Sequence, residues 1–259
     1  MTEEILVKRD GAVMTLTLNR PDKFNALTFG MYTRLAEVCE GVGRDGTVRA
    51  IVLTGAGTKA FAAGTDIAQF RDFKSEQDGI AYEARLDQIL STIERCAVPT
   101  IAAIAGACTG GGAAIAACCD MRIATRDARY GYPIARTLGN CLSAASLQRL
   151  SALMGPARVT DLLFTSRLMS AEECLTAGLV TEIVDDHAAL MVRAETLARQ
   201  IAGHAPLTIS VTKELMRRLR EVDAKVDDHD LVGMIYTSED FREGLEAFLA
   251  KRKPVWRGR

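Results

Sequence analysis

The sequence has almost no surplus of charge of either sign. Its 259 residues include 32 lysines and arginines and 33 aspartates and glutamates, so the net charge is −1 and the pI is about 6.3. A surface that tracks a nucleic-acid backbone usually needs a basic surplus. We therefore do not expect nucleic acid as a partner.

The sequence also lacks a long apolar run. No segment approaches the roughly 20 apolar residues that span a bilayer, and the N-terminal MTEEILVKRD has no apolar signal core. No linker, low-complexity stretch or sequence repeat is evident. These absences predict a cytoplasmic protein with no membrane partner.

The seven cysteines lack a CxxC pair, and their number is odd. Several lie among apolar residues, as buried thiols do: Cys96, Cys108, Cys118, Cys119 and Cys174. This pattern favours a reducing compartment. The three histidines, His187, His204 and His229, fall in the C-terminal region and are expected at the surface or an interface rather than as bases. No metal site is predicted.

Hydrophobic residues make up 48% of the chain, enough for one large domain or for a core domain with an appendage. Alternation from Ala12 to Leu18 predicts a half-buried strand. Further strands are predicted over 49–54, from Pro99, over 120–125 and over 179–184. Helices are predicted after an N-cap at Thr28 and over 83–95, 144–154, 157–164, 170–177, 188–202, 206–222 and 238–250. Ser170 and Glu173 have the form of a capping box.

Two glycine-rich turns follow predicted strands. One lies within AIAGACTGGGAAIAACCD, from Ala103 to Asp120, and the other is GAGTKAFAAGTDIAQF, from Gly55 to Phe70. Three consecutive glycines, Gly110 to Gly112, let the backbone at a helix start approach a bound group closely. Such a turn could hold a phosphate or a developing oxyanion, or could only pack a helix tightly against a sheet. The glycine run alone does not distinguish these possibilities.

The two turns together resemble the signature segments of the crotonase superfamily, also called the enoyl-CoA hydratase/isomerase family. The matching segments are AFAAGTDI and GACTGGGAAIAACCD, with LNRPDKFNALT before them and SAEECLTAGLVTEIV and EGLEAFLAKRK after them. The resemblance spans essentially the whole chain. It implies an α/β fold, a crotonase-type spiral of repeated β-β-α units over residues 1–187, followed by a C-terminal helical region for trimerisation over 188–259.

The resemblance also implies a coenzyme A thioester site. The backbone N–H groups of Thr65 and Gly111 would stabilise an enolate, and two such fixed donors suit a charge that develops on one oxygen. Residues implied to line the coenzyme A groove are Lys23, Phe24, Ala26, Ala63, Asp66 and Ile67, with Phe248 and Lys251 supplied by a neighbouring subunit. The alternatives are that Asp66 only caps the next helix and that the basic residues 251–253 are a solvated helix end.

The same resemblance implies no permanently bound cofactor, because coenzyme A arrives as part of the substrate. It implies a homotrimer or a dimer of trimers. It further predicts an acyl-CoA-processing enzyme, a lyase or isomerase.

The sequence departs from the hydratase pattern at two positions. A hydratase of this family uses two glutamates to hold and deprotonate water, and Ala114 and Ile134 occupy the matching positions here. Neither side chain can activate water, and losing one such group typically costs a factor of about 10² to 10⁴. Two-glutamate hydration is therefore doubtful.

The zone from Arg136 to Ser143, in the loop after the predicted strand over 120–125, offers other candidates for the chemistry. Asn140 could hold a carboxylate or a water, Cys141 could be a nucleophile if its pKa were lowered, and Arg136 could pair with a substrate carboxylate. Each also has a structural explanation: a turn residue, a buried thiol and a surface or interface charge. Tyr132 could pack or place its hydroxyl in the pocket.

Four functions are compatible with the sequence. The first is an acyl-CoA enzyme that stabilises a thioester enolate, and the second a decarboxylase, isomerase or hydrolase of a specialised acyl-CoA. The third is a non-catalytic acyl-CoA binder. The fourth, a nucleotide-binding domain using the glycine run, fits poorly because the lysine and hydroxyl pair of a P-loop is missing.

Overall fold

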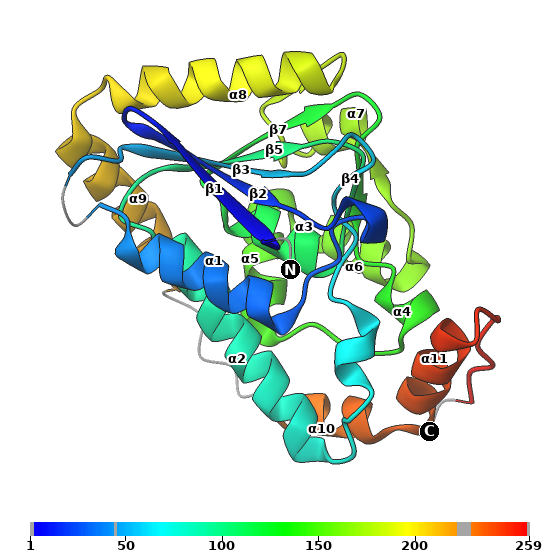
Figure 1. The fold of residues 1–259 in the computed structure, drawn as a ribbon. Coiled ribbons are helices and arrows are strands. Elements are labelled where there is room, and N and C mark those ends of the chain that lie inside the picture. Colours follow the sequence, from blue (N-terminus) through cyan, green and yellow to red (C-terminus); the bar gives the residue numbers. More distant parts are fainter. Residues whose placement is uncertain (1–2, 44–45, 222–228, 258–259) are drawn as a thin grey trace.

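Two β-sheets flanked by helices form the described residues, 3–43, 46–221 and 229–257, of this computed structural model (Figure 1). The larger sheet has the strand order β1-β2-β3-β5-β7-β10. β1 and β2 form an antiparallel hairpin, and the remaining neighbours pair in parallel. Its strands are β1 (Ile5–Asp10), β2 (Val13–Leu18), β3 (Ala50–Gly55), β5 (Thr100–Ile104), β7 (Met121–Thr125) and β10 (Glu182–Val184).

The smaller sheet has the order β4-β6-β8-β9. Its strands are β4 (Ala60–Ala62), β6 (Ala107–Thr109), β8 (Arg129–Gly131) and β9 (Met169–Ser170). Along the chain β3 leads to β4, β5 to β6 and β7 to β8, and each pair is followed by helix. This repeated order is the predicted α/β spiral of β-β-α units, which the structure confirms.

The helices cover both faces of the larger sheet. Figure 1 shows α8 on one face, with α1, α2, α3 and α5 on the other. The α-helices are α1 (Phe29–Gly41), α2 (Glu76–Glu94), α3 (Gly111–Cys118), α4 (Ile134–Thr137), α5 (Ala144–Met154), α6 (Pro156–Thr165), α7 (Ala171–Thr176), α8 (His187–Ala202), α9 (Pro206–Glu221), α10 (His229–Thr237) and α11 (Glu239–Leu249). Two short 3-10 helices are η1 (Pro21–Lys23) and η2 (Ile67–Phe70).

Strand β3 shows why the sheet needs helices on both sides. All six of its residues are buried. Ile51 and Leu53 belong to the large core on the α1 side, whereas Ala50 and Val52 pack in a second core with Leu190 of α8. A parallel strand that is buried on both faces typically has a nearly continuous run of apolar residues. The segment AIVLT has this pattern.

Several local predictions are confirmed at the level of single hydrogen bonds. The Thr28 side chain accepts from the Met31 N–H at 3.2 Å and caps α1. Ser170 and Glu173 form the predicted capping box of α7. Helix α5 has the predicted bounds, 144–154.

Other boundaries differ from the prediction. Helix α2 begins at Glu76 rather than residue 83, because Ser75 and Asp78 form a capping box that moves the helix start to an exposed polar turn. β1 and α10 were not predicted. Five of the six β1 residues are exposed, so the strand lacks an alternating apolar pattern. The predicted helix end at Val222 lies outside the described residues.

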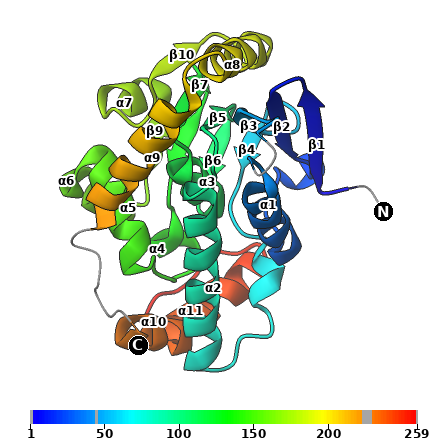
Figure 2. The ribbon, with the colours of Figure 1, turned by 90° about the vertical axis from the view of Figure 1, so that its left-hand side faces the viewer.

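The C-terminal helices pack on their own chain. Helix α8 lies on the larger sheet, α10 on α2, and α11 against α4 and η2. Helix α9 runs along the outside next to α5 (Figure 2). The predicted division into a spiral core over residues 1–187 and a C-terminal helical region for oligomerisation over 188–259 stays a prediction. Among the helices of the described ranges, none combines the length and apolar composition needed to cross a membrane.

Candidate functional site

The two glycine turns meet at the ends of β4 and β6. These strands pair in parallel, so the segments that follow them leave the same edge of the smaller sheet. Gly64 and Gly110 both have positive φ, at 108° and 51°. A Cβ placed on Gly64 would lie 3.5 Å from the Thr109 carbonyl oxygen and 3.8 Å from the Gly111 nitrogen. The structure thus brings Thr65 and Gly111 together, as predicted from two distant segments.

The hydrogen bonds around these turns hold the backbone on either side of Thr65, and Gly111 begins a helix. The Leu27 N–H donates to Gly64 and the Asp66 N–H donates to Leu27, each at 2.8 Å, which leaves Thr65 between them. Gly111 is the first residue of α3, where N–H groups have no partner within the helix. Within the described ranges, neither the Thr65 N–H nor the Gly111 N–H donates to a backbone carbonyl. Both residues line one cavity of about 100 Å³.

A chain of three hydroxyl groups supports this part of the cavity. Thr65 Oγ1 lies 2.9 Å from the Tyr32 hydroxyl and 3.1 Å from the Tyr82 hydroxyl. Burial raises the pKa of the Tyr82 hydroxyl well above its ordinary value, and burial likewise raises the pKa of Tyr32. These phenols therefore stay protonated near neutral pH. A Cβ on Gly111 would overlap the Tyr32 oxygen, which explains why glycine is required there.

Ala114 and Ile134 both line the same cavity. Ala114 lies on α3 three residues after Gly111, and Ile134 is the first residue of α4. A methyl group and a branched alkyl chain thus face the region beside the two N–H groups. Neither can bind or deprotonate water.

The loop candidates divide into those inside and outside the cavity. Asn140 and Cys141 line it, as does the buried Tyr132. The Asn140 Nδ2 lies 3.4 Å from the Tyr236 hydroxyl, and its Oδ1 is buried with no donor in reach among the described residues. Arg136 is exposed on α4 and is not one of the lining residues. The structure therefore does not bring Arg136 to the other candidates.

Glu83 lines the cavity and was not predicted from the sequence. This α2 residue is 5% exposed, and its Oε1 accepts a hydrogen bond of 2.6 Å from the Tyr236 hydroxyl. Tyr236 belongs to α10, 153 positions further along the chain. The apolar spacing of α2 identifies its core face but gives no sign that a polar residue beside that face meets a distant tyrosine.

The predicted coenzyme A segments lie side by side. The Ala63 N–H donates to the Phe24 carbonyl at 3.0 Å, and the exposed Lys23 precedes Phe24. Ala26 is half-buried, and its carbonyl accepts from Arg20 at 2.6 Å. Ile67 begins η2 and lines the cavity.

Asp66 caps the helix that follows it, which is one of the two roles predicted for it. Its side chain accepts from the Ala68 N–H at 3.2 Å, at the start of η2. It also forms an ion pair of 2.9 Å with Arg20. At the other end of the chain, Phe248 and Lys251 are exposed at the end of α11 and just after it. Their predicted contribution to a neighbour's groove concerns an assembly and stays a prediction.

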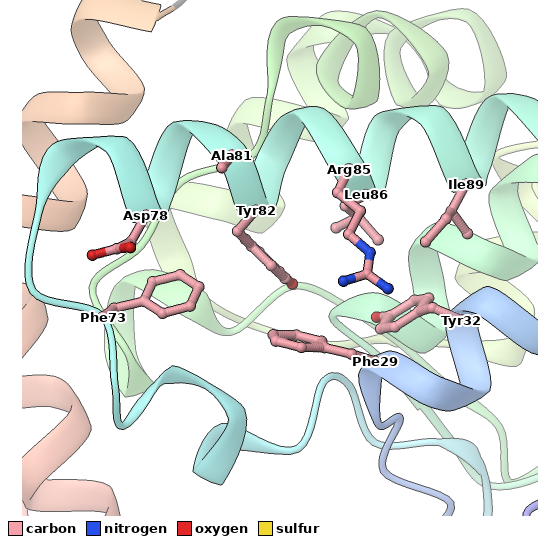
Figure 3. Close-up of a pocket in the computed structure, with 9 residues that line it drawn as sticks. All are labelled: Phe29, Tyr32, Phe73, Asp78, Ala81, Tyr82, Arg85, Leu86 and Ile89. Carbon is pink, nitrogen blue, oxygen red and sulfur yellow. The ribbon is translucent and has the colours of Figure 1, made fainter.

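A second pocket, of about 210 Å³, lies between α1 and α2 (Figure 3). It shares Tyr82 and Leu86 with the first cavity. Its remaining lining residues are mainly apolar or aromatic, with two charged groups: Phe29, Tyr32, Phe73, Asp78, Ala81, Arg85 and Ile89. The Arg85 guanidinium lies 5.9 Å from the centre of the Phe29 ring and donates to Thr33 at 2.9 Å.

Metal ligands are not grouped in the part of the chain that the structure describes: no three His, Cys, Asp or Glu side chains there could hold one ion.

The spiral of β-β-α units and the two adjoining glycine turns define the crotonase class of α/β proteins. The chain belongs to the enoyl-CoA hydratase/isomerase family, whose model matches residues 8–259. It is 32% identical over 252 residues to a short-chain-enoyl-CoA hydratase of Clostridium acetobutylicum, covering 96% of this chain and 95% of that protein. It is thus an enzyme of a family that processes acyl-CoA thioesters.

Several solved structures cover this chain completely, and two of them differ in how closely they match its backbone. An enoyl-CoA hydratase/carnithine racemase from Magnetospirillum magneticum has 36% identity and a TM-score of 0.80, with 97% of that chain covered. A methylmalonyl-CoA decarboxylase in complex with 2-nitronate-propionyl-CoA has 28% identity and a TM-score of 0.90, with 100% of that chain covered. The structure with the lower identity therefore matches this backbone more closely.

Proposed function

We propose that this protein stabilises the enolate of an acyl-CoA thioester with the backbone N–H groups of Thr65 and Gly111. The observation that carries the proposal is that these two N–H groups adjoin one cavity without donating to a backbone carbonyl of the described chain. Fixed donors stabilise a developing oxyanion without reorganising, and removing one typically costs about 10² to 10³ in kcat.

The reaction is not hydration by two glutamates. Ala114 and Ile134 line the cavity where that mechanism would need carboxylates. A decarboxylase, isomerase or hydrolase of a specialised acyl-CoA is therefore the preferred class. The TM-score of 0.90 to a methylmalonyl-CoA decarboxylase supports this preference over the hydratase activity in the relatives' names. A non-catalytic acyl-CoA binder is the second candidate, favoured by the same two apolar side chains.

The test measures two activities on the same preparation. Propionyl-CoA and longer thioesters in deuterated water should exchange their α-protons in the presence of the protein, as mass spectrometry or NMR would show. Crotonyl-CoA should be hydrated far more slowly than the roughly 10 per second that is typical of enzymes. Rapid hydration would contradict the conclusion that Ala114 and Ile134 leave the cavity unable to activate water. Binding of thioesters without exchange of any of them would favour the binder.

Coenzyme A itself would lie along the segments 23–26 and 63–67, which a hydrogen bond from the Ala63 N–H to the Phe24 carbonyl joins. The second segment also lines the cavity. No permanently bound cofactor is part of this proposal. Phe248 and Lys251 of a neighbouring subunit would complete the groove in a homotrimer or a dimer of trimers. Asn140 and Cys141 remain candidate catalytic residues because they line the cavity, whereas Arg136 would act only through a partner or substrate outside it.

The α1–α2 pocket would hold the apolar part of the acyl group. It adjoins the first cavity through Tyr82 and Leu86, and its walls are largely aromatic and aliphatic. Ala81 lines only this pocket, so Ala81→Trp should narrow it. The KM for long-chain or aromatic thioesters should rise about tenfold, at a cost near 1.4 kcal/mol, while KM for acetyl-CoA stays unchanged. An equal change for all chain lengths would contradict this placement.

A further inference from the structure

Glu83 places a carboxylate in the cavity that contains the Thr65 and Gly111 N–H groups. Among the described lining residues it carries the only carboxyl group. The residue is 5% exposed. Burying a carboxylate is costly unless hydrogen bonds compensate it, and the Tyr236 hydroxyl donates one at 2.6 Å. The cavity thus lacks carboxylates where a hydratase needs them but has one on a different wall.

The packing of α2 against α10 holds this carboxylate in place. A Cβ on Gly79 of α2 would lie 2.4 Å from the Tyr236 side chain, so glycine is needed for the ring to lie against the helix. Glu83 is four residues later, on the same side of α2, where the Tyr236 hydroxyl reaches it. Gly233 of α10 meets Glu76 in a similar close approach. These two close approaches let α2 and α10 pack near enough for the Tyr236 hydroxyl to donate to Glu83.

Asn140 extends the polar wall. Its Nδ2 approaches the Tyr236 hydroxyl at 3.4 Å, so that hydroxyl accepts from Asn140 and donates to Glu83. Burial, and then the charge of Glu83, raise the pKa of Tyr236 well above its ordinary value. Tyr236 therefore stays protonated, and can donate its hydrogen bond, throughout the pH range in which a carboxylate acts as a base.

We propose that Glu83 is the catalytic base that removes the α-proton of the bound acyl-CoA. The inference rests on the proposed function. The Cα–H bond breaks and its electron pair forms the double bond between Cα and the thioester carbon. The charge that develops on the thioester oxygen faces the Thr65 and Gly111 N–H groups, and the proton lies on the Glu83 carboxyl group.

A proton then returns to the substrate from the Glu83 carboxyl group. If solvent has first replaced the proton on that group, its delivery to Cα gives exchange with solvent. Delivery of a proton to Cγ of a β,γ-enoyl thioester instead moves the double bond to Cα and Cβ. Neither route needs a co-reactant. Tyr236 is a positioning residue, because it acts on Glu83 rather than on the substrate.

The main test compares Glu83→Gln with Asp87→Asn. The glutamine keeps the volume and an oxygen that accepts from Tyr236, but it cannot take a proton. Its α-proton exchange rate should fall about 10² to 10⁴-fold, with thioester affinity within about threefold of wild type. Asp87 lies one turn later on α2, accepts from Ser143 at 2.7 Å and is not among the lining residues. Asp87→Asn should therefore leave exchange unchanged.

A second variant covers the case in which the amide disturbs the fold. The α-proton exchange rate of Glu83→Ala should fall to the same extent. Added formate should raise that rate at least tenfold, because formate can occupy the volume that the missing side chain leaves. Tyr236→Phe should retain more activity than either variant, since the base itself is still present.

The outcomes separate the inference from the proposed function. If the wild-type protein exchanges α-protons and Glu83→Gln keeps more than half of that rate, the role of Glu83 is overturned but the proposed function is not. Absence of rescue by formate in a folded Glu83→Ala that still binds thioester would also overturn it. Wild-type protein that exchanges no thioester would instead refute the proposed function.

Discussion

At the scale of single residues, the Gly111 N–H can be removed without removing its helix. Gly111 is the first residue of α3, a position that tolerates proline because its N–H lacks a helical partner. A side chain there would overlap the Tyr32 oxygen, so the comparison is made in Tyr32→Phe. In that background Gly111→Pro should exchange α-protons about 10² to 10³ times more slowly than Gly111→Ala.

The alanine variant is the matched control, because both substitutions add a Cβ and only proline removes the donor. Exchange would be measured by NMR in deuterated water, with calorimetry of coenzyme A thioesters to confirm that both variants bind. Equal exchange rates in the two variants would show that the Gly111 N–H does not stabilise the enolate.

Residues differ in how well the sequence predicts their roles. Thr65 and Gly111 were expected to lie together because each belongs to a glycine-rich turn of a motif that the sequence shows directly, and the structure brings both to one cavity. Their role as oxyanion donors stays a prediction. The capping role of Asp66 could be predicted as one alternative, because a cap depends on residues only two or three positions away. Glu83 could not be found, since its hydrogen bond comes from α10.

At the scale of elements, the segment after α11 gives a pH-dependent contact next to the site. The Arg252 guanidinium, together with the Val255 N–H, lowers the pKa of Glu243 from its ordinary value near 4.5 to about 2. A lowered pKa stabilises docking above about pH 4.5, and this contribution is lost as pH falls through about 2. We expect the segment to stay docked at neutral pH and to detach between those values.

Trp256 reports this detachment. It is the only tryptophan of the chain, and a Cβ on Gly139 in the site loop would lie 3.2 Å from its ring. Its fluorescence should stay constant from pH 7 to about 4.5 and shift to the red below that. Glu243→Gln should show part of the red shift already at pH 7, while Glu37→Gln on α1 should not. A spectrum insensitive to both acid and Glu243→Gln would contradict the contact.

Helices with a side-chain cap were easier to predict from the sequence than short strands. Helices with a side-chain cap, such as α1 and α7, were placed closely because the cap and the apolar stripe are both local signals. The short strands of the smaller sheet were not predicted. β4, β6 and β8 have three residues each, too few for a period of two to show.

At the scale of the whole molecule, the spiral was predictable because each strand, turn and helix repeats in order along the chain. The return of α10 and α11 onto their own chain was not, because their apolar faces do not specify which surface they cover. This return completes the candidate site: it brings Tyr236 to Glu83 and packs α11 against the loop that carries Leu138. The full site is therefore a property of the tertiary fold.

Assembly is the remaining prediction at this scale. Helix α9 exposes an apolar stripe with a spacing of four residues: Leu207, Val211, Leu215 and Leu219, each at least 54% exposed. On another side of the helix, Lys213 pairs with Asp120 at 2.7 Å. An exposed stripe of this kind indicates a protein interface, and the predicted homotrimer or dimer of trimers would supply it.

The substitution Val211→Glu combined with Leu215→Glu tests this interface. Two charges in the stripe should convert a particle of three or six 28.0 kDa chains into a single chain, as light scattering after gel filtration would show. Val192→Glu on α8 is the control, because it adds a charge at an apolar side chain that is 68% exposed on another helix. An assembly that survives the α9 substitutions would place the subunit contacts elsewhere. A monomeric wild type would remove the neighbour that Phe248 and Lys251 are expected to serve.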